Sequence, residues 1–385
     1  MARPHPFDEA DARRLLGGLL SRAPAAAVGG SLSSRDAHTL VAVAGRHLLS
    51  PALWTALEAQ GRHDLLPGDL AEYLEAIHSL NRRRNGRLLA QAAAIATDLR
   101  ARGLDGVFLK GAALLMLGTF RDPADRIVGD IDLLVPPGTE EAAADALAAA
   151  GYRRLPDGVP DAHDRVKLAH PDLPAMVELH TALLPGDLAG IAPAEAVRAA
   201  AIDVPCATGR ALVPCLDDLV AHNVAHAMLH HRFYRQAELP LRDAFDLALL
   251  APAGPRWDRI ADRMAADPDG PPALRFYLAA TRAFLPDTPL PGLAPDPVAD
   301  AAAGRALGRW SARRGRTPGR LAIAAVNLGA HLRDEVRRLR DLPGDRSRAV
   351  RRLLEPGFYP RIARALVDVT RYGPAPRAAR RRDRP

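Results

Sequence analysis

The sequence has little cysteine and no long apolar run. Its two cysteines, Cys206 and Cys215, cannot build a disulfide framework, and their spacing matches no zinc-binding pattern. No stretch of about 18 apolar residues is present, and the first residues lack a hydrophobic signal segment. We therefore expect a cytoplasmic protein with reduced thiols, without a membrane span and without a secretory signal.

Aromatic residues are also scarce, at 4% of 385 residues, so alanine, leucine and valine must fill the cores. Alanine and leucine are strong helix formers, and this composition favours a largely helical protein. The formal net charge is +7, and much of the excess lies in an arginine-rich segment at 372–385. No aromatic residue is interleaved with the arginines from Arg377 on, so a nucleic-acid partner is conceivable but not favoured.

Apolar residues recur at helical spacing toward both ends of the chain. Ser33 and Ser34 are start signals for a helix that is expected to run to residue 59, and Asp69 is a candidate N-cap of the following helix. Later helices are predicted near 192–201, 216–232, 239–252, 256–266, 272–284, 297–313 and 317–341. We expect helical regions at 1–103 and 191–371 and a disordered basic tail at 372–385.

Between the helical regions the period changes to that of strands. Short apolar or alternating runs predict five strands, at 106–109, 130–135, 152–155, 165–169 and 176–183. An alanine-rich helix is expected from Thr139 to about residue 150. We therefore predict a small mixed-sheet core at 104–190, which makes the whole chain an α+β protein with helical regions on both sides of the core.

Three carboxylates in this core are expected to converge. Asp130 and Asp132 lie two residues apart on a strand and project from the same face. Glu178 and His180 do the same on another strand. Carboxylates side by side repel unless a cation lies between them, and Mg²⁺ together with substrate phosphates is a common solution. The alternative is a pair of solvent-facing aspartates on an edge strand.

Lys110 and Gly111 occupy a predicted strand-to-helix turn that precedes the aspartates. A helix N-terminus offers free backbone N–H groups to a phosphate, and a lysine there adds a positive charge. Arg126, shortly before Asp130, is either a phosphate clamp through its planar guanidinium or a loop arginine in water.

These motifs resemble a known family. The matching segments are Phe108-Leu109-Lys110-Gly111, Arg126, the run from Asp130 to Val135, and Val177-Glu178-Leu179-His180. They are similar to those of uncharacterised nucleotidyltransferases in the DNA-polymerase-β-like superfamily. The resemblance is strong over 104–184 and continues more weakly to about residue 250, where His222, His226, Arg242 and Asp246 resemble positions that the family uses.

The resemblance implies a nucleotidyltransferase fold and an enzyme that moves an NMP from an NTP, ATP by default, to a hydroxyl or phosphate group. It implies Asp130, Asp132 and Glu178 as ligands of Mg²⁺ or Mn²⁺, with Glu178 also helping to deprotonate the attacking hydroxyl. The nucleotide would be bound by Lys110, Gly111, Arg126 and His180, with Lys110-Gly111 in place of the superfamily's usual Gly-Ser turn.

The sequence leaves the acceptor open. A small molecule, a peptide or protein side chain and an RNA end are all compatible with it, and the low aromatic content argues against a long RNA. A second hypothesis is a non-catalytic module that binds nucleotide or nucleic acid on the same fold.

For two further groups of charged residues, the sequence favours a structural role over a catalytic one. The arginines of the long helix, Arg82, Arg83, Arg84 and Arg87, are expected on a solvated face. Arg242 and Asp246 are expected to pair along one helix.

Histidines recur on one later helix. His222, His226 and His230 follow one helical face and His231 is off that face. Two histidines at this spacing can bind zinc, but no third ligand is evident, and we expect them to pack at the substrate cleft instead.

Overall fold

The computed structural model describes residues 7–21, 31–155, 166–231 and 233–292. The helices predicted at 297–313 and 317–341 and the tail at 372–385 lie outside the described residues. No helix of the described part is both long and apolar enough to cross a bilayer.

The N-terminal region is helical, as predicted. It contains α1 (Glu9–Leu20), α2 (Ser34–Arg46), α3 (Ser50–Ala59), the 3₁₀ turn η1 (His63–Leu65) and α4 (Gly68–Arg100). The side chain of Ser33 accepts a hydrogen bond from the Asp36 backbone N–H, which confirms the predicted start of α2.

Two details of the predicted helices are wrong. The helix expected to continue to residue 59 breaks after Arg46, because Leu48 takes a positive φ of 56° and Pro51 requires a new first turn. Pro67, not Asp69, precedes α4. Asp69 lies inside the first turn, where its charge suits the positive end of the helix dipole.

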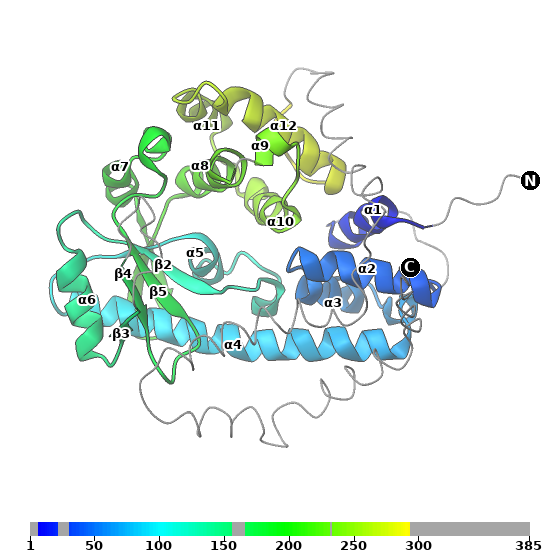
Figure 1. Cartoon of the computed structure of the whole chain (residues 1–385), viewed down its shortest axis with the longest axis horizontal. Helices are drawn as coiled ribbons and strands as arrows, with labels where there is room; N and C mark the ends of the chain where they lie inside the picture. Colours follow the sequence, from blue (N-terminus) through cyan, green and yellow to red (C-terminus); the bar gives the residue numbers. More distant parts are fainter. Residues whose placement is uncertain (1–6, 22–30, 156–165, 232, 293–385) are drawn as a thin grey trace, which may run out of the picture.

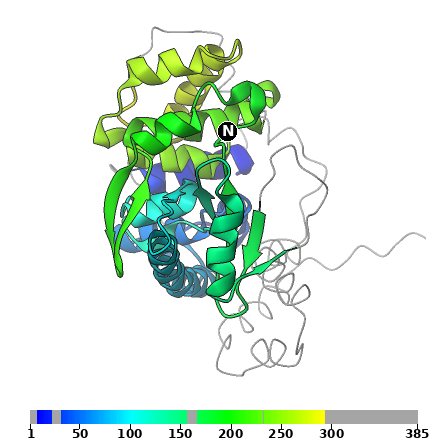
Figure 2. The same cartoon turned by 90° about the vertical axis from the view of Figure 1, so that its left-hand side faces the viewer.

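The helix α4 has 33 residues and connects the helical region to the sheet. It runs beneath both in Figure 1 and contacts α3, α5, α6 and β7. In the view of Figure 2 it is seen nearly end-on, with the yellow-green C-terminal helices on the opposite side of the molecule. The sheet therefore lies between α4 and later helices.

The sheet contains all five predicted strands. These are β1 (Val107–Phe108), β2 (Asp130–Leu134), β3 (Arg153–Arg154), β4 (Val166–Ala169) and β5 (Met176–His180). The strand order is β3-β4-β5-β2-β1-β7-β6, with β2 parallel to β5 and antiparallel to β1. This mixed sheet, together with the helices, confirms the α+β fold class.

Two strands were not expected. β6 (Ile202–Cys206) and β7 (Gly209–Val213) form a hairpin, and β7 joins the sheet by parallel pairing with β1. The sheet therefore extends beyond residue 190, where we expected the core to end. β6 is an edge strand that contains Pro205, which weakens its strand signal, although Ile202, Val204 and Cys206 alternate along it.

The remaining elements surround the sheet or build the C-terminal helical region. They are α5 (Lys110–Met116), η2 (Pro123–Asp125), α6 (Glu140–Ala149), η3 (Gly186–Leu188), α7 (Ala194–Ala199), α8 (Leu216–Ala225), the π-helical turn η4 (His226–His230), α9 (Phe233–Gln236), α10 (Leu241–Leu250), η5 (Ala251–Ala253), α11 (Trp257–Met264) and α12 (Gly270–Phe284).

The two helical regions are in contact through α1 and α12. Gly17 of α1 lies so close to α12 that a Cβ on it would be 1.9 Å from the backbone oxygen of Phe284. Only glycine permits this approach of the two helices.

Candidate active site

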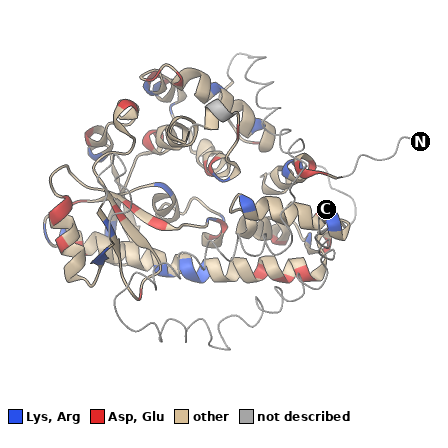
Figure 3. Ribbon diagram, viewed as in Figure 1, with Lys and Arg blue, Asp and Glu red and all other residues tan. Residues whose placement is uncertain are grey.

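The predicted acidic residues meet on two adjacent parallel strands. In the register of β2 and β5, Asp132 is the partner of Glu178. Asp130 and Asp132 alternate with Ile131 and Leu133, which are fully buried on the other face. The red segments on the central strands in Figure 3 mark this acidic cluster.

This face of the sheet is covered rather than open to solvent. Asp132 is 3% exposed, Glu178 6% and His180 5%. β2 is an interior strand, so the alternative of solvent-facing aspartates on an edge strand is wrong for Asp132. Buried carboxylates require charged or hydrogen-bonding partners, and each of these groups has one.

One oxygen of Asp132 receives two donors. Lys110 Nζ lies 2.7 Å from Asp132 Oδ1, and His180 Nε2 lies 2.8 Å from the same atom. Burial alone would raise the pKa of Asp132, but the hydrogen bond from His180 and the charge of Lys110 outweigh it, so the pKa lies below its usual value. Asp132 is therefore a carboxylate.

The backbone explains why Lys110 reaches Asp132. The Leu109 N–H donates to the Asp132 carbonyl at 2.9 Å and extends the β1–β2 ladder to the residue before the turn. Lys110 then starts α5 with a positive φ of 50°, a conformation that is uncommon outside glycine. Such strain often occurs at functional sites. The predicted strand-to-helix turn at Lys110 is confirmed.

Gly111, the next residue, is placed in a close contact. A Cβ on it would lie 2.9 Å from the side chain of Val128, which is buried on the segment leading into β2. A glycine here lets α5 pack directly against the approach to the aspartates.

Glu178 has a lysine partner that we did not predict from the sequence. Lys167 of β4 lies with Nζ 3.2 Å from Glu178 Oε1. One signal for it was present in the composition, because all but two of the 52 lysine and arginine residues are arginine. The two lysines are Lys110 and Lys167, and both bind carboxylates of this cluster.

Asp130 differs from Asp132 in its surroundings. It is half-buried, and burial and the adjacent charge of Asp132 raise its pKa above the usual value. The charge of Glu178 also raises the pKa of Asp130, so Asp130 belongs to a cluster of mutually repelling carboxylates. Such a cluster attracts a cation.

The donor set fits a divalent metal ion. Ligand atoms of Asp132, Glu178 and His180 all lie within 4.8 Å of one another. Hard carboxylate oxygens suit Mg²⁺ or Mn²⁺, whereas imidazole suits softer transition metals. His180 also contacts Asp132 directly, so its chemistry fits that of a residue that orients a metal-binding carboxylate.

His222 of α8 borders this cluster. Burial and the charge of Lys110 lower its pKa to about 3, with opposing influence from Asp132, so the ring is neutral. Its Nε2 is buried and has no hydrogen-bond partner among the described residues. A buried nitrogen of this kind is available to a bound molecule.

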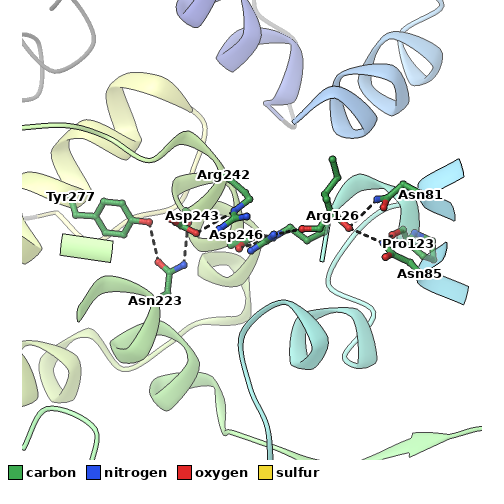
Figure 4. A network of polar contacts seen from close by, with 10 residues as sticks. Asn81, Asn85, Pro123, Arg126, Asn223, Arg242, Asp243, Asp246 and Tyr277 are labelled. Atoms are coloured by element: carbon green, nitrogen blue, oxygen red, sulfur yellow. Dashed lines mark hydrogen bonds and ion pairs between the residues drawn. The ribbon is translucent and has the colours of Figure 1, made fainter. Parts of the chain in front are cut away.

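Arg126 binds protein groups in this structure. Its Nε donates to both carboxylate oxygens of Asp246 at 3.0 Å, and its Nη1 donates to the Ile127 carbonyl at 2.6 Å. The Arg126 carbonyl in turn accepts hydrogen bonds from Asn81 and Asn85 of α4. Figure 4 shows this network, which links α4, the segment before β2 and α10.

The predicted ion pair between Arg242 and Asp246 is wrong, because each residue pairs with a different partner. Asp246 pairs with Arg126, and Arg242 lies 3.6 Å from its neighbour Asp243. Residues 120 positions apart in the sequence give no periodic signal, whereas an i,i+4 pair always does.

The arginines of α4 are not a uniformly solvated face. Arg82 pairs with Asp122, while Arg84 and Arg87 donate to backbone carbonyls before β2 and β5. Only Arg83 of this group is exposed without a described partner. The arginines therefore help to hold the segments that carry the acidic strands against α4.

Comparison with known proteins adds a family. The model of a protein family described as uncharacterised nucleotidyltransferase matches residues 33–285. That range covers the sheet, the acidic cluster and the helices from α2 to α12. No curated protein and no solved structure matches the chain.

Proposed function

The chain belongs to this family of uncharacterised nucleotidyltransferases, and we propose that it transfers an NMP from an NTP, with ATP as the first candidate, to a hydroxyl or phosphate of an acceptor. The match supports nucleotidyl transfer in general. The donor, the acceptor and the dependence on metal are our proposal.

One observation carries the proposal. Asp132 and Glu178 are register partners on parallel strands, buried, and each bound by one of the two lysines of the chain. A merely structural ion pair would not require two carboxylates of like charge beside a third, Asp130. Nucleotidyl transfer does require such a cluster, because it depends on positioning and on neutralising phosphate charge.

Asp130, Asp132 and Glu178 are the proposed ligands of Mg²⁺ or Mn²⁺. Such an ion would supply charge neutralisation for the triphosphate. His180 holds Asp132 in place through Oδ1. Lys110 is the proposed partner of a phosphate group, next to Gly111, and Arg126 remains a proposed nucleotide ligand although it now binds Asp246.

Glu178 is the proposed general base for the attacking hydroxyl. It lies next to His180, whose Nε2 is 3.8 Å from Glu178 Oε2, and Lys167 holds the other oxygen. The side chain of Lys167 is 42% exposed, so it reaches solvent beside the buried Glu178. We propose a small molecule or a peptide or protein as acceptor.

The test is calorimetry of NTP binding with and without Mg²⁺. The wild type, Asp130→Asn/Asp132→Asn and the control Asp145→Asn, an exposed aspartate on α6, are compared after thermal melts establish folding. Metal-dependent binding that is lost only in the double variant supports the proposal and names the donor. Equal binding by all three proteins contradicts the site.

A folded wild type that binds no NTP in the presence of Mg²⁺ would contradict an enzyme that binds its donor first. Salt-sensitive binding of nucleic acid without turnover would instead favour the non-catalytic module.

A further inference from the structure

The helix after the acidic cluster contains a second group of possible ligands. Nitrogen atoms of His226, His230 and His231 all lie within 4.8 Å of one another. The ring centroids of His226 and His231 are 4.4 Å apart, and those of His230 and His231 are 4.9 Å apart. These residues take no part in the proposed nucleotidyl transfer.

A change in helix type creates this group. In an α-helix, residues four apart share a face and a residue five apart points elsewhere, so the sequence predicts His231 off the face of His226 and His230. That prediction is wrong. α8 widens into the π-helical turn η4, in which the His231 N–H donates to the His226 carbonyl at 3.0 Å. The wider turn brings His231 back beside His226.

π-helical turns are rare in proteins, and those that occur are often found at functional sites. A π-helical turn lacks some of the regular hydrogen bonds of an α-helix. Here it places the imidazole of His231 beside those of His226 and His230. The third ligand that the sequence lacks is supplied by the backbone conformation.

We propose that His226, His230 and His231 bind a transition-metal dication, Zn²⁺ foremost, at a site distinct from the carboxylate cluster. Neutral imidazole is a preferred ligand of Zn²⁺, Ni²⁺ and Cu²⁺ and a poor one for Mg²⁺. The two sites therefore select different ions by their ligand atoms.

The geometry needs only a small adjustment. Nitrogens at about 2.0–2.1 Å from a tetrahedral ion lie about 3.4 Å from one another. The nitrogens, which all lie within 4.8 Å of one another, would have to approach by rotation of the rings. Three protein ligands leave a fourth position for water or for an anionic group of a bound molecule.

The site adjoins the proposed active site through His222. The ring centroids of His222 and His226 are 5.5 Å apart, and the charge of Lys110 acts on both rings. A dication held here lies one helical turn beyond the histidine that borders Asp132. It would add positive charge on the side of the cluster that faces the C-terminal helices.

The probe is Co²⁺, whose visible absorption depends on its coordination, added to the full chain without a histidine tag in the presence of excess Mg²⁺. His231→Ala is the main variant because the residue is exposed, and His63→Ala, an exposed histidine on η1, is the matched control. Asp132→Asn tests the carboxylate cluster, and His226→Ala provides a second ligand deletion.

The expected result is one equivalent of Co²⁺ with absorption bands of four- or five-coordinate geometry, displaced by Zn²⁺. Affinity should fall by more than the roughly 10–100-fold that loss of an outer-shell partner costs in His231→Ala and His226→Ala, and remain in His63→Ala and Asp132→Asn. Bands that survive in His231→Ala and disappear in Asp132→Asn would overturn the proposal, as would an absence of bound Co²⁺ in folded wild type.

Discussion

The buried pair of Arg126 and Asp246 allows a quantitative prediction. Their side chains are 7% and 3% exposed, so Arg126→Met leaves the Asp246 carboxylate buried without its principal partner. Removing one member of such a pair costs about 3–5 kcal/mol. In a domain of 150–250 residues each kcal/mol lowers Tm by about 2–4 °C, so we expect a fall of roughly 6–20 °C.

The network around the pair explains why movement of the side chains into water will not offset this cost. The Arg126 backbone is fixed by Asn81 and Asn85 of α4, and Asp246 is fixed in α10, so neither side can move to water. Burial already raises the pKa of Asp246 to about 6, with Arg126 opposing the shift. Loss of Arg126 removes that opposition and favours the protonated acid further.

The assay is thermal and urea denaturation of four proteins: wild type, Arg126→Met, the double variant Arg126→Met/Asp246→Leu, and the exposed control Arg121→Met. The double variant should be more stable than Arg126→Met, because it removes both buried charges. The control should lie within about 0.5 kcal/mol of wild type. A folded Arg126→Met with unchanged Tm would refute the structural role of the pair.

Three further predictions concern the two neighbouring aspartates and the contact of α1 with α12. Asp130→Asn should stabilise the protein near neutral pH: the folded-state pKa of Asp130 is raised above 3.8, so its favourable contribution is present below 3.8 and lost as pH rises through the folded value. Asp132→Asn should destabilise the protein by about 1.5–3 kcal/mol. The folded-state pKa of Asp132 is lowered, so its stabilising contribution is present above 3.8 and is lost only as pH falls. Thermal melts from pH 4 to 8 compare the two variants, and equal effects on stability would contradict the opposite pKa shifts. Gly17→Ala should lower the free energy of unfolding by at least about 3 kcal/mol, since α1 and α12 must separate to admit the methyl group. The control Gly86→Ala meets open space on α4 and should raise the free energy of unfolding by up to about 1 kcal/mol. A neutral Gly17→Ala would show that the contact of α1 and α12 is absent in solution.

The acidic strands could be predicted from the sequence because their signal is local. Alternation along Asp130 to Val135 defines both the strand and the face of its carboxylates, and the turn at Lys110 follows a short apolar run. The same holds for Ser33 as a helix cap, since its partner lies three residues away. The roles assigned to the site residues stay predictions.

Other features depend on contacts between distant residues, and no local pattern encodes them. Pairing of Arg126 with Asp246, of Lys167 with Glu178 and of β7 with β1 joins segments that are apart in the chain. Burial of Asp132 follows from its interior strand, which alternation alone cannot distinguish from an edge strand.

The histidines show the division most clearly. The sequence determined their spacing, and with a regular helix that spacing gives two ligands. The π-helical turn changed the angular position of His231 by inserting one residue into a helical turn. Its formation depends on how α8, α9 and α12 pack around it, which is a property of the folded chain. The sequence alone therefore determined which ligand types are present, and the tertiary structure decided which of them meet.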